Sequence, residues 1–221
     1  HVGDHARRIH GFGRTEGGRH EPRLLLAAGM HRELSEEPPI FLRVWRSQTA
    51  HNQPIVRPRV SESLDWEGEL AVIIGTPGRK IARADALKHV WGYTIVNDVT
   101  ARDVQGRLKQ WLVGKSFDTF CPMGPWAVTA DEIDLSNTTL KTWVNGELRQ
   151  NANTRDLIFD VPTIIETISA GVTLRAGDII ATGTPVGVGI GFTPPKYLKN
   201  GDVVEIEIGG IGRLRNPVKT I

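Results

Sequence analysis

Short apolar runs separated by polar turns dominate the chain from residue 64 onward. β-Branched residues fill these runs and Gly, Asn and Asp separate them, a pattern typical of β-strands joined by tight turns. In "VVEIEI" (203–208), Val and Ile alternate with Glu, which predicts one buried face and one wet face. The dipeptide Asn145-Gly146 predicts a two-residue hairpin turn, because both residue types tolerate positive φ. Strands are therefore predicted within "ELAVIIG" (69–75), "GYTIVNDV" (92–99), "TLKTWVNGELRQ" (139–150), "GDIIATG" (177–183) and "GDVVEIEI" (201–208).

Helical patterns are fewer and predict two helices, over residues 82–90 and 160–171. The second has Asp160 as a candidate N-cap, an apolar side that includes Ile164, and Gly171 at its end. Many strands with two helices favour a mainly β fold with a few helices (α+β). A doubly wound α/β sheet would need regular alternation of strands and helices.

The first 60 residues differ from the rest of the chain. They are irregular and rich in Arg, Gly, His and Pro, with one apolar patch "LLLAAGM" (24–30) and one predicted short strand in "PIFLRVW" (39–45). We therefore predict an N-terminal irregular or lid region at residues 1–60 and a catalytic β domain at residues 61–221. A chain of 221 residues is long enough to bury a substantial core.

Composition excludes several classes of protein. Lys plus Arg total 27 against 25 Asp plus Glu, so the formal charge is +2, which favours neither nucleic acid nor a membrane surface as a partner. Cys121 is the only cysteine, which excludes an internal disulfide. No apolar run approaches the roughly 20 residues of a membrane-spanning helix. The chain opens on "HVGDHARRIHG" without methionine, so we expect residues to precede it and take cytoplasmic as the default location.

Three carboxylates stand at the start of an apolar strand in "LDWEGELAVIIG" (64–75). Side chains alternate faces along a strand, so Asp65, Glu67 and Glu69 are predicted to project to one side. A divalent cation would remove their mutual repulsion, and oxygen ligands suit Mg²⁺, Mn²⁺ or Ca²⁺ better than zinc. A solvated strand end is the simpler alternative for an isolated E-x-E.

A fourth carboxylate ends a second apolar run. In "IVNDVTARD" (95–103), Ile95 and Val96 lead into Asn97 and Asp98. Taken alone, Asp98 suits an Asx turn or a helix cap equally well. Two apolar strands that both end in carboxylates nevertheless favour a metal site shared between them.

Motifs along nearly the whole chain extend this pattern: "DHA" (4–6), "EPPIFLR" (37–43), "LDWEGELAVIIG" (64–75), "GYTIVNDVTARDVQ" (92–105), "GKSFDTFCPMGP" (114–125), "VNGELRQ" (144–150) and "GDIIATGTPVGVG" (177–189). In this order they resemble the fumarylacetoacetate hydrolase family. The resemblance implies a mixed β-sandwich roll, a homodimer, and a metal-dependent enzyme for small 2-oxo or 1,3-dicarbonyl acids. It also implies Glu67, Glu69 and Asp98 as ligands of Mg²⁺ or Mn²⁺, with Asp65 a neighbour of the site.

The resemblance further implies residues that bind the substrate. Lys115 would contact a substrate carboxylate or enolate oxygen, although a surface lysine with a buried stem is the simpler interpretation of the residue alone. Arg102 and Gln105 would line the cavity, although Arg102 could equally pair with Asp103 or Asp98. Thr184 would offer its hydroxyl and N–H to a substrate carboxylate. "ATGTPVGVGIG" (181–191) lacks the spacing of a nucleotide-binding loop, so its glycines indicate tight turns.

His5 and Glu37 are the predicted water-activating pair. A histidine oriented by a carboxylate can deprotonate water near neutral pH, and hydrolytic members of the family carry such a pair on a mobile lid. Here "GDHA" supplies His5 and "EEPPIF" supplies Glu37. The sequence departs from the family at Val2-Gly3, at Arg43-Val44 and in the spacing between the motifs. Rival candidates are Glu33 and Glu36 for the carboxylate, and His10, His20 and His31 for the base.

The function predicted first is a divalent-metal-dependent hydrolase that cleaves a carbon–carbon bond in acylpyruvate or fumarylpyruvate-type 2,4-dioxo acids. The enolate that such cleavage forms also serves other reactions, because fold does not settle the reaction. The alternative is therefore an isomerase or decarboxylase of hydroxymuconate-type or oxaloacetate-like 2-oxo acids. From a different class, the chain could be a non-catalytic module that binds a metal and a 2-oxo acid.

Overall fold

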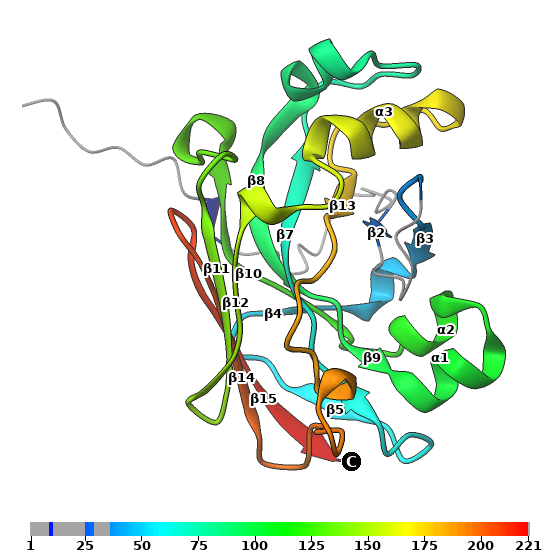
Figure 1. Ribbon diagram of the computed structural model, residues 1–221, viewed down its shortest axis with the longest axis vertical. Coiled ribbons are helices and arrows are strands. Elements are labelled where there is room, and N and C mark those ends of the chain that lie inside the picture. Colours follow the sequence, from blue (N-terminus) through cyan, green and yellow to red (C-terminus); the bar gives the residue numbers. More distant parts are fainter. Residues whose placement is uncertain (1–8, 11–24, 29–35, 221) are drawn as a thin grey trace, which may run out of the picture.

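Two β-sheets packed against one another form the body of the computed structural model (Figure 1). The structure describes the backbone at Ile9–His10 and Leu25–Ala28 and whole residues from 36 to 220. Within that part the strands are β1 (Ile9–His10), β2 (Leu25–Ala28), β3 (Ile40–Arg43), β4 (Gln48–Ala50), β5 (Ile55–Arg57), β6 (Leu64–Asp65), β7 (Gly68–Ile74), β8 (Val90–Asn97), β9 (Thr100–Ala101), β10 (Cys121–Thr129), β11 (Thr139–Val144), β12 (Glu147–Asn153), β13 (Ile179–Ala181), β14 (Val203–Ile208) and β15 (Gly212–Thr220). The α-helices are α1 (Arg102–Leu108), α2 (Trp111–Lys115) and α3 (Val161–Gly171), and 3₁₀ turns occur at Trp45–Ser47, Arg83–His89, Ala130–Glu132, Thr154–Asp156 and Gly189–Gly191.

The larger sheet has the strand order β1-β10-β8-β7-β13-β2-β3, with β4 paired to β10. The smaller has the order β12-β11-β14-β15-β5, and β6 pairs with β9 in a separate short ladder. Strands β4 and β5, which precede residue 61, pair with β10 and β15 respectively. The mainly β fold with a few helices is confirmed, whereas the functional division into 1–60 and 61–221 stays a prediction.

Local turn chemistry follows the sequence closely. Asn145 and Gly146 have φ of 53° and 80° and join β11 to β12, as the hairpin prediction requires. In β14, Val204, Ile206 and Ile208 are buried while the intervening residues are partly exposed, so the alternation is confirmed.

The helices agree with the sequence only in part. α3 begins where expected, and the Asp160 side chain accepts a hydrogen bond from the Thr163 N–H at 2.9 Å. The segment predicted as a helix over 82–90 forms a 3₁₀ turn over Arg83–His89, with no capping side chain at its start. α1 and α2 were not predicted, because both are short, both lack a capping side chain and α1 carries Gly106 in its interior. These two helices lie together beside β9, at the lower right of Figure 1.

Candidate metal centre and substrate site

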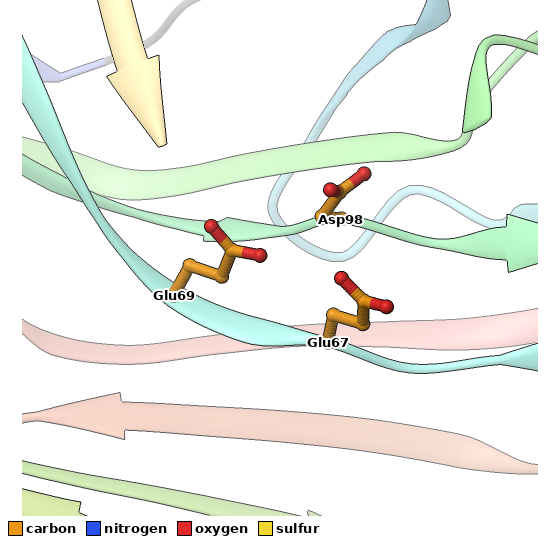
Figure 2. Close-up of side chains that lie close together, drawn as sticks. All are labelled: Glu67, Glu69 and Asp98. Carbon is orange, nitrogen blue, oxygen red and sulfur yellow. The ribbon is translucent and has the colours of Figure 1, made fainter. Parts of the chain in front are cut away.

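The register between β7 and β8 brings the two carboxylate motifs together. The strands are antiparallel, with Gly68 opposite Asn97 and Glu69 opposite Val96. Just beyond the paired residues, the Asp98 N–H donates to the Glu67 carbonyl at 2.8 Å. Figure 2 shows the consequence: the carboxylates of Glu67, just before β7, of Glu69, within β7, and of Asp98, just after β8, turn toward one another.

Glu67, Glu69 and Asp98 form a compact acidic triad. One oxygen from each carboxylate lies within 4.8 Å of the other two, and all three side chains are buried. Burial and the nearby charge of Glu67 raise the pKa of Glu69 to about 8. Burial would also raise the pKa of Glu67, but Lys115 and Arg102 outweigh it and hold that pKa below its usual value.

One carboxylate oxygen of the triad is a candidate metal ligand because no hydrogen-bond donor reaches it from the described residues. Glu69 Oε2 accepts the Gly183 N–H at 2.7 Å, whereas Glu69 Oε1 is buried and has no hydrogen-bond partner within the part of the chain that the structure describes. An unpartnered buried carboxylate oxygen is costly. Three hard oxygen donors around it match the ligand preference of Mg²⁺ or Mn²⁺. The triad could therefore hold a divalent ion, and it fits the metal that the sequence led us to expect.

Lys115 places a positive charge directly beside the triad. It is the last residue of α2, is 2% exposed, and its Nζ lies 2.9 Å from each of Glu67 Oε2, Asp98 Oδ2 and Thr100 Oγ1. Burial lowers the pKa of Lys115. α2 can pack this closely against α1 because Gly114 has no side chain. A Cβ at Gly114 would lie 2.8 Å from the Gln105 backbone N. Lys115 is thus a buried site residue and not a surface lysine.

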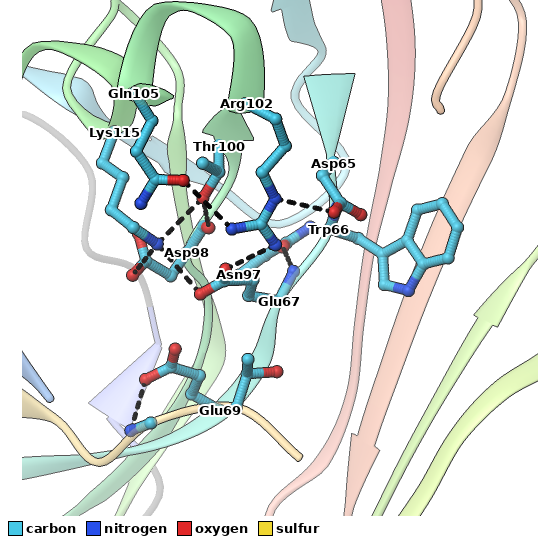
Figure 3. Close-up of polar contacts among 12 residues, drawn as sticks. Asp65, Trp66, Glu67, Glu69, Asn97, Asp98, Thr100, Arg102, Gln105 and Lys115 are labelled. Atoms are coloured by element: carbon cyan, nitrogen blue, oxygen red, sulfur yellow. Dashed lines mark hydrogen bonds and ion pairs between the residues drawn. The ribbon is translucent and has the colours of Figure 1, made fainter. Parts of the chain in front are cut away.

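Arg102 bridges two carboxylates at the start of α1. Its Nε donates to Asp65 Oδ2 at 2.8 Å, and its Nη2 lies 2.7 Å from Glu67 Oε1 (Figure 3). It therefore pairs with neither Asp103 nor Asp98, the partners weighed from the sequence. Gln105 lies one helical turn farther along, with its Oε1 3.4 Å from Arg102 Nη1.

The prediction that Asp65, Glu67 and Glu69 share one strand face was incomplete. The strand is interrupted, because β6 ends at Asp65 and β7 begins at Gly68. Asp65 lies outside the triad and is fully buried, and its carboxylate accepts backbone N–H groups of the segment after β13. Sequence periodicity misplaces Asp65 because alternation holds only within one unbroken strand.

The Thr184 hydroxyl is held by the protein itself. It donates to the Gly68 carbonyl at 3.1 Å and accepts from Gln150 Nε2 at 2.8 Å. A role for Thr184 in binding a substrate carboxylate would thus draw first on its backbone N–H. Gln150, from the other sheet, was missed as a site residue, although "VNGELRQ" ends on it. Its amide is fully buried and spans the two sheets.

Arg43 is a second residue that the sequence analysis did not assign. It ends β3, its side chain is fully buried, and its guanidinium pairs with Asp98 and donates to the carbonyls of Lys115 and Phe120. A signal was present, because Arg43 stands where the family commonly has lysine. The site thus contains two buried cations, Arg43 and Lys115, and the partly buried Arg102 among four buried carboxylates.

The predicted water-activating pair is only partly within the described residues. Glu37 is exposed on the segment that leads through Pro38 to β3. His5 lies outside the described residues, as do the rivals Glu33, His20 and His31. The geometry of the pair stays a prediction.

The model of the family described as "Fumarylacetoacetate (FAA) hydrolase C-terminal" matches residues 18–219. The chain belongs to the fumarylacetoacetate hydrolase family. It is 50% identical over 192 residues to oxaloacetate tautomerase YisK of Bacillus subtilis. The aligned region covers 86% of this chain and 64% of that relative. The chain thus spans less than two thirds of the length of this curated relative.

Solved structures of the family have the same fold. The fumarylacetoacetate hydrolase of Exiguobacterium antarcticum is 45% identical with a TM-score of 0.86, over 90% of this chain and 76% of that one. The 5-carboxymethyl-2-hydroxymuconate delta-isomerase of Mycobacterium smegmatis is 42% identical with a TM-score of 0.83, over 90% and 77% respectively. The names of these two structures, a hydrolase and an isomerase, indicate that one fold serves more than one reaction in the family. Among the helices in the described residues, none is long and apolar enough to cross a membrane.

Proposed function

We propose that the protein is a metal-dependent isomerase of a small 2-oxo acid, acting as a keto–enol tautomerase on an oxaloacetate-like substrate. The observation that carries the proposal is the position of Lys115, a buried ammonium group 2.9 Å from two carboxylates of the acidic triad. A fixed cation beside a metal site is placed to stabilise the oxygen of an enolate. Similarity to an oxaloacetate tautomerase and to a hydroxymuconate isomerase favours isomerisation over carbon–carbon cleavage.

The proposed reaction moves one proton between C3 and the oxygen on C2, and it neither consumes water nor breaks a carbon–carbon bond. Glu67, Glu69 and Asp98 would hold Mg²⁺ or Mn²⁺, which supplies positive charge to the substrate carboxylate and the adjacent oxygen. Lys115 Nζ donates a hydrogen bond to the C2 oxygen as negative charge develops there. Arg102, with Gln105 beside it, holds a substrate carboxylate. Because Lys115 and the acidic triad are buried and Arg102 is held by two carboxylates before the reaction, little reorganisation is needed.

Hydrolysis of acylpyruvates is the second candidate. The Exiguobacterium structure named as a fumarylacetoacetate hydrolase favours it, as does the placement of Glu37 just before β3, whose Arg43 reaches the site. This reaction needs a base for water, the role predicted for His5. We also retain the predictions of a homodimer and of a cytoplasmic location. Light scattering on the purified protein would test the dimer.

The test separates the reactions by product. Purified protein with Mg²⁺, and after chelation, is given enol-oxaloacetate, a hydroxymuconate-type diene acid and an acylpyruvate. Ultraviolet absorbance follows loss of the enol, and a coupled assay follows pyruvate. Metal-dependent loss of enol without pyruvate is expected. Pyruvate from the acylpyruvate would favour the hydrolase, pyruvate from oxaloacetate the decarboxylase, and metal binding without turnover the binding module.

A pair of lysine variants tests the role of Lys115. Lys115→Met keeps the length of the side chain and removes its charge, so kcat is expected to fall by about 10²–10³, as for loss of one oxyanion donor. Lys88→Met is the control, because Lys88 is exposed and pairs with the exposed Asp85. Full activity in Lys115→Met would remove the basis of the proposal.

A further inference from the structure

Asp65 collects donors from two distant parts of the chain. It is fully buried, and its carboxylate accepts the backbone N–H groups of Gly189 at 2.6 Å and Ile190 at 3.0 Å. It also accepts the N–H of Trp66 at 2.8 Å and the Nε–H of Arg102 at 2.8 Å. The carboxylate therefore connects Arg102, at the start of α1, to the glycine-rich segment at residues 182–191.

These contacts fix the orientation of Arg102. A guanidinium is a rigid planar fork, so two anchored nitrogens define the direction of the third. Nε is bound by Asp65 and Nη2 by Glu67, whereas within the part of the chain that the structure describes Nη1 has only a long contact of 3.4 Å to Gln105 Oε1. The Nη1 edge is thus the part of Arg102 left to donate to a substrate carboxylate.

The glycine-rich segment is built to approach Asp65. A Cβ at Gly189 would lie 2.7 Å from Asp65 Oδ1, so only glycine lets this amide come so close. Gly189 is further held by the Lys196 N–H, which donates to its carbonyl at 2.9 Å. The segment begins at Thr182 and includes Thr184, the other residue predicted to bind substrate.

We propose that Asp65 is a positioning residue that aims the Nη1 edge of Arg102 at the substrate carboxylate and couples it to the segment at residues 182–191. Asp65 is neither a metal ligand nor a group that touches substrate. The proposal rests on the proposed function, because it takes Arg102 as a substrate-binding residue. A purely structural Asp65 would hold the segment without affecting how Arg102 binds.

Steady-state kinetics separate these two roles. Asp65→Asn keeps the shape of the side chain but replaces one carboxylate oxygen by an NH₂ group. This donor would face another donor, either the Arg102 Nε–H or a backbone N–H, so KM is expected to rise about tenfold with a smaller change in kcat. The matched control is Asp103→Asn. The Asp103 carboxylate accepts from the Ser61 hydroxyl and the Glu62 N–H, whereas the Arg102 guanidinium pairs with Asp65 and Glu67, so the Asp103 variant should lower thermal stability and leave KM unchanged.

A double-mutant cycle tests whether Asp65 acts through Arg102. In an Arg102→Lys background the Nε–H donor is absent, so adding Asp65→Asn is expected to change KM by less than about twofold. An undiminished tenfold rise in that background would overturn the proposal. If Asp65→Asn yields no folded protein, the cycle is run with Asp65→Glu, which keeps the charge but shifts the carboxylate by one methylene.

Amide hydrogen exchange tests the coupling without any activity. Arg102→Lys alone is expected to speed exchange at Gly189 and Ile190, because Asp65 loses one of its anchors. Unchanged exchange rates at these amides would overturn the proposed coupling between Arg102 and the segment at residues 182–191, irrespective of the enzymatic activity. Absence of turnover in the wild-type protein, with exchange altered as expected, would instead refute only the proposed function.

Discussion

Gln150 Oε1 accepts the backbone N–H of Gly68 at 3.0 Å, which ties β12 of the smaller sheet to β7 of the larger one. The same side chain donates from Nε2 to Thr184 Oγ1 and to the Pro185 carbonyl. Gly68 lies between Glu67 and Glu69, so this contact fixes the backbone from which both carboxylates project. The packing of the two sheets and the geometry of the triad are therefore linked.

Gly68→Ala is expected to weaken both the packing of the two sheets and the binding of a metal ion by the acidic triad. A Cβ at this position would press on Thr142 Oγ1 and lie 3.1 Å from Gln150 Oε1 and 3.2 Å from Ile206 Cγ2. Overpacking of this kind costs about 1–3 kcal/mol of the free energy of unfolding. Mg²⁺ affinity should fall as well, because the flanking carboxylates move. Urea denaturation and calorimetric titration with Mg²⁺ measure the two effects.

Two further variants sharpen this test. Gly106→Ala is the matched control, because a Cβ there meets nothing within 4 Å and α1 should gain about 0.5–1 kcal/mol. Adding Thr142→Ala to Gly68→Ala should recover part of the loss, since Thr142 Oγ1 has no hydrogen-bond partner among the described residues. Wild-type stability in Gly68→Ala would show that the sheets are less tightly packed than the structure indicates.

Mg²⁺ is expected to stabilise the folded protein through Glu69. A ligand present at about 100 times its Kd and bound only to the folded state adds about 2.7 kcal/mol to the free energy of unfolding. Glu69→Gln keeps an acceptor for the Gly183 N–H but removes the charge beside the unpartnered Oε1. It should abolish the stabilisation by Mg²⁺ while leaving the metal-free protein folded.

Differential scanning calorimetry with and without Mg²⁺ measures this shift. Glu207→Gln serves as the control, because Glu207 is paired with Arg213 on the surface, away from the triad. An Mg²⁺-dependent shift that persists in Glu69→Gln would contradict the assignment of Glu69 as a ligand.

Stability at low pH is expected to depend on the cap of α3. Asp160 accepts the Thr163 N–H at 2.9 Å and lies 2.5 Å from Arg83 Nη2. Although partial burial opposes it, these contacts lower the pKa of Asp160 below 3.8. A carboxylate with a lowered folded-state pKa stabilises above its unfolded pKa, and this stabilisation is lost as pH falls through the folded value. The contribution should thus be complete at pH 5 and above, and decline below about pH 4.

Asp160→Ala should cost about 1 kcal/mol at neutral pH, as for loss of an N-cap. The difference in melting temperature between wild type and Asp160→Ala should narrow as the pH is lowered below about 4. Asn can cap the helix but does not titrate, so the melting temperature of Asp160→Asn should fall less than that of the wild type when the pH is lowered below about 4. A difference independent of pH would argue against an ionised cap.

Local patterns predicted the strands and the acidic residues of the site, but not its long-range contacts. The pattern made Asp65, Glu67, Glu69 and Asp98 candidates because they stand at the ends of apolar strands, and the family resemblance then selected Glu67, Glu69 and Asp98 as the predicted ligands. Gln150 could not be chosen, because its role depends on how two sheets stack, and no local period encodes that register. α1 was missed for a related reason, since tertiary packing, and not capping or propensity, stabilises so short a helix.

The predicted water-activating pair, His5 and Glu37, offers a way to separate hydrolysis from isomerisation. Only hydrolysis needs a base for water, so Glu37→Gln and His5→Ala should lower any acylpyruvate hydrolysis by about 10²–10⁴. Isomerisation of oxaloacetate should be retained in both, because the proposed mechanism of isomerisation uses Lys115 and the acidic triad and needs no base for water. Glu132→Gln is the matched control, since Glu132 is exposed in the turn Ala130–Glu132, and Glu36→Gln tests the rival candidate for the carboxylate. Equal loss of both reactions in His5→Ala would show that His5 acts on the enolate and not on water.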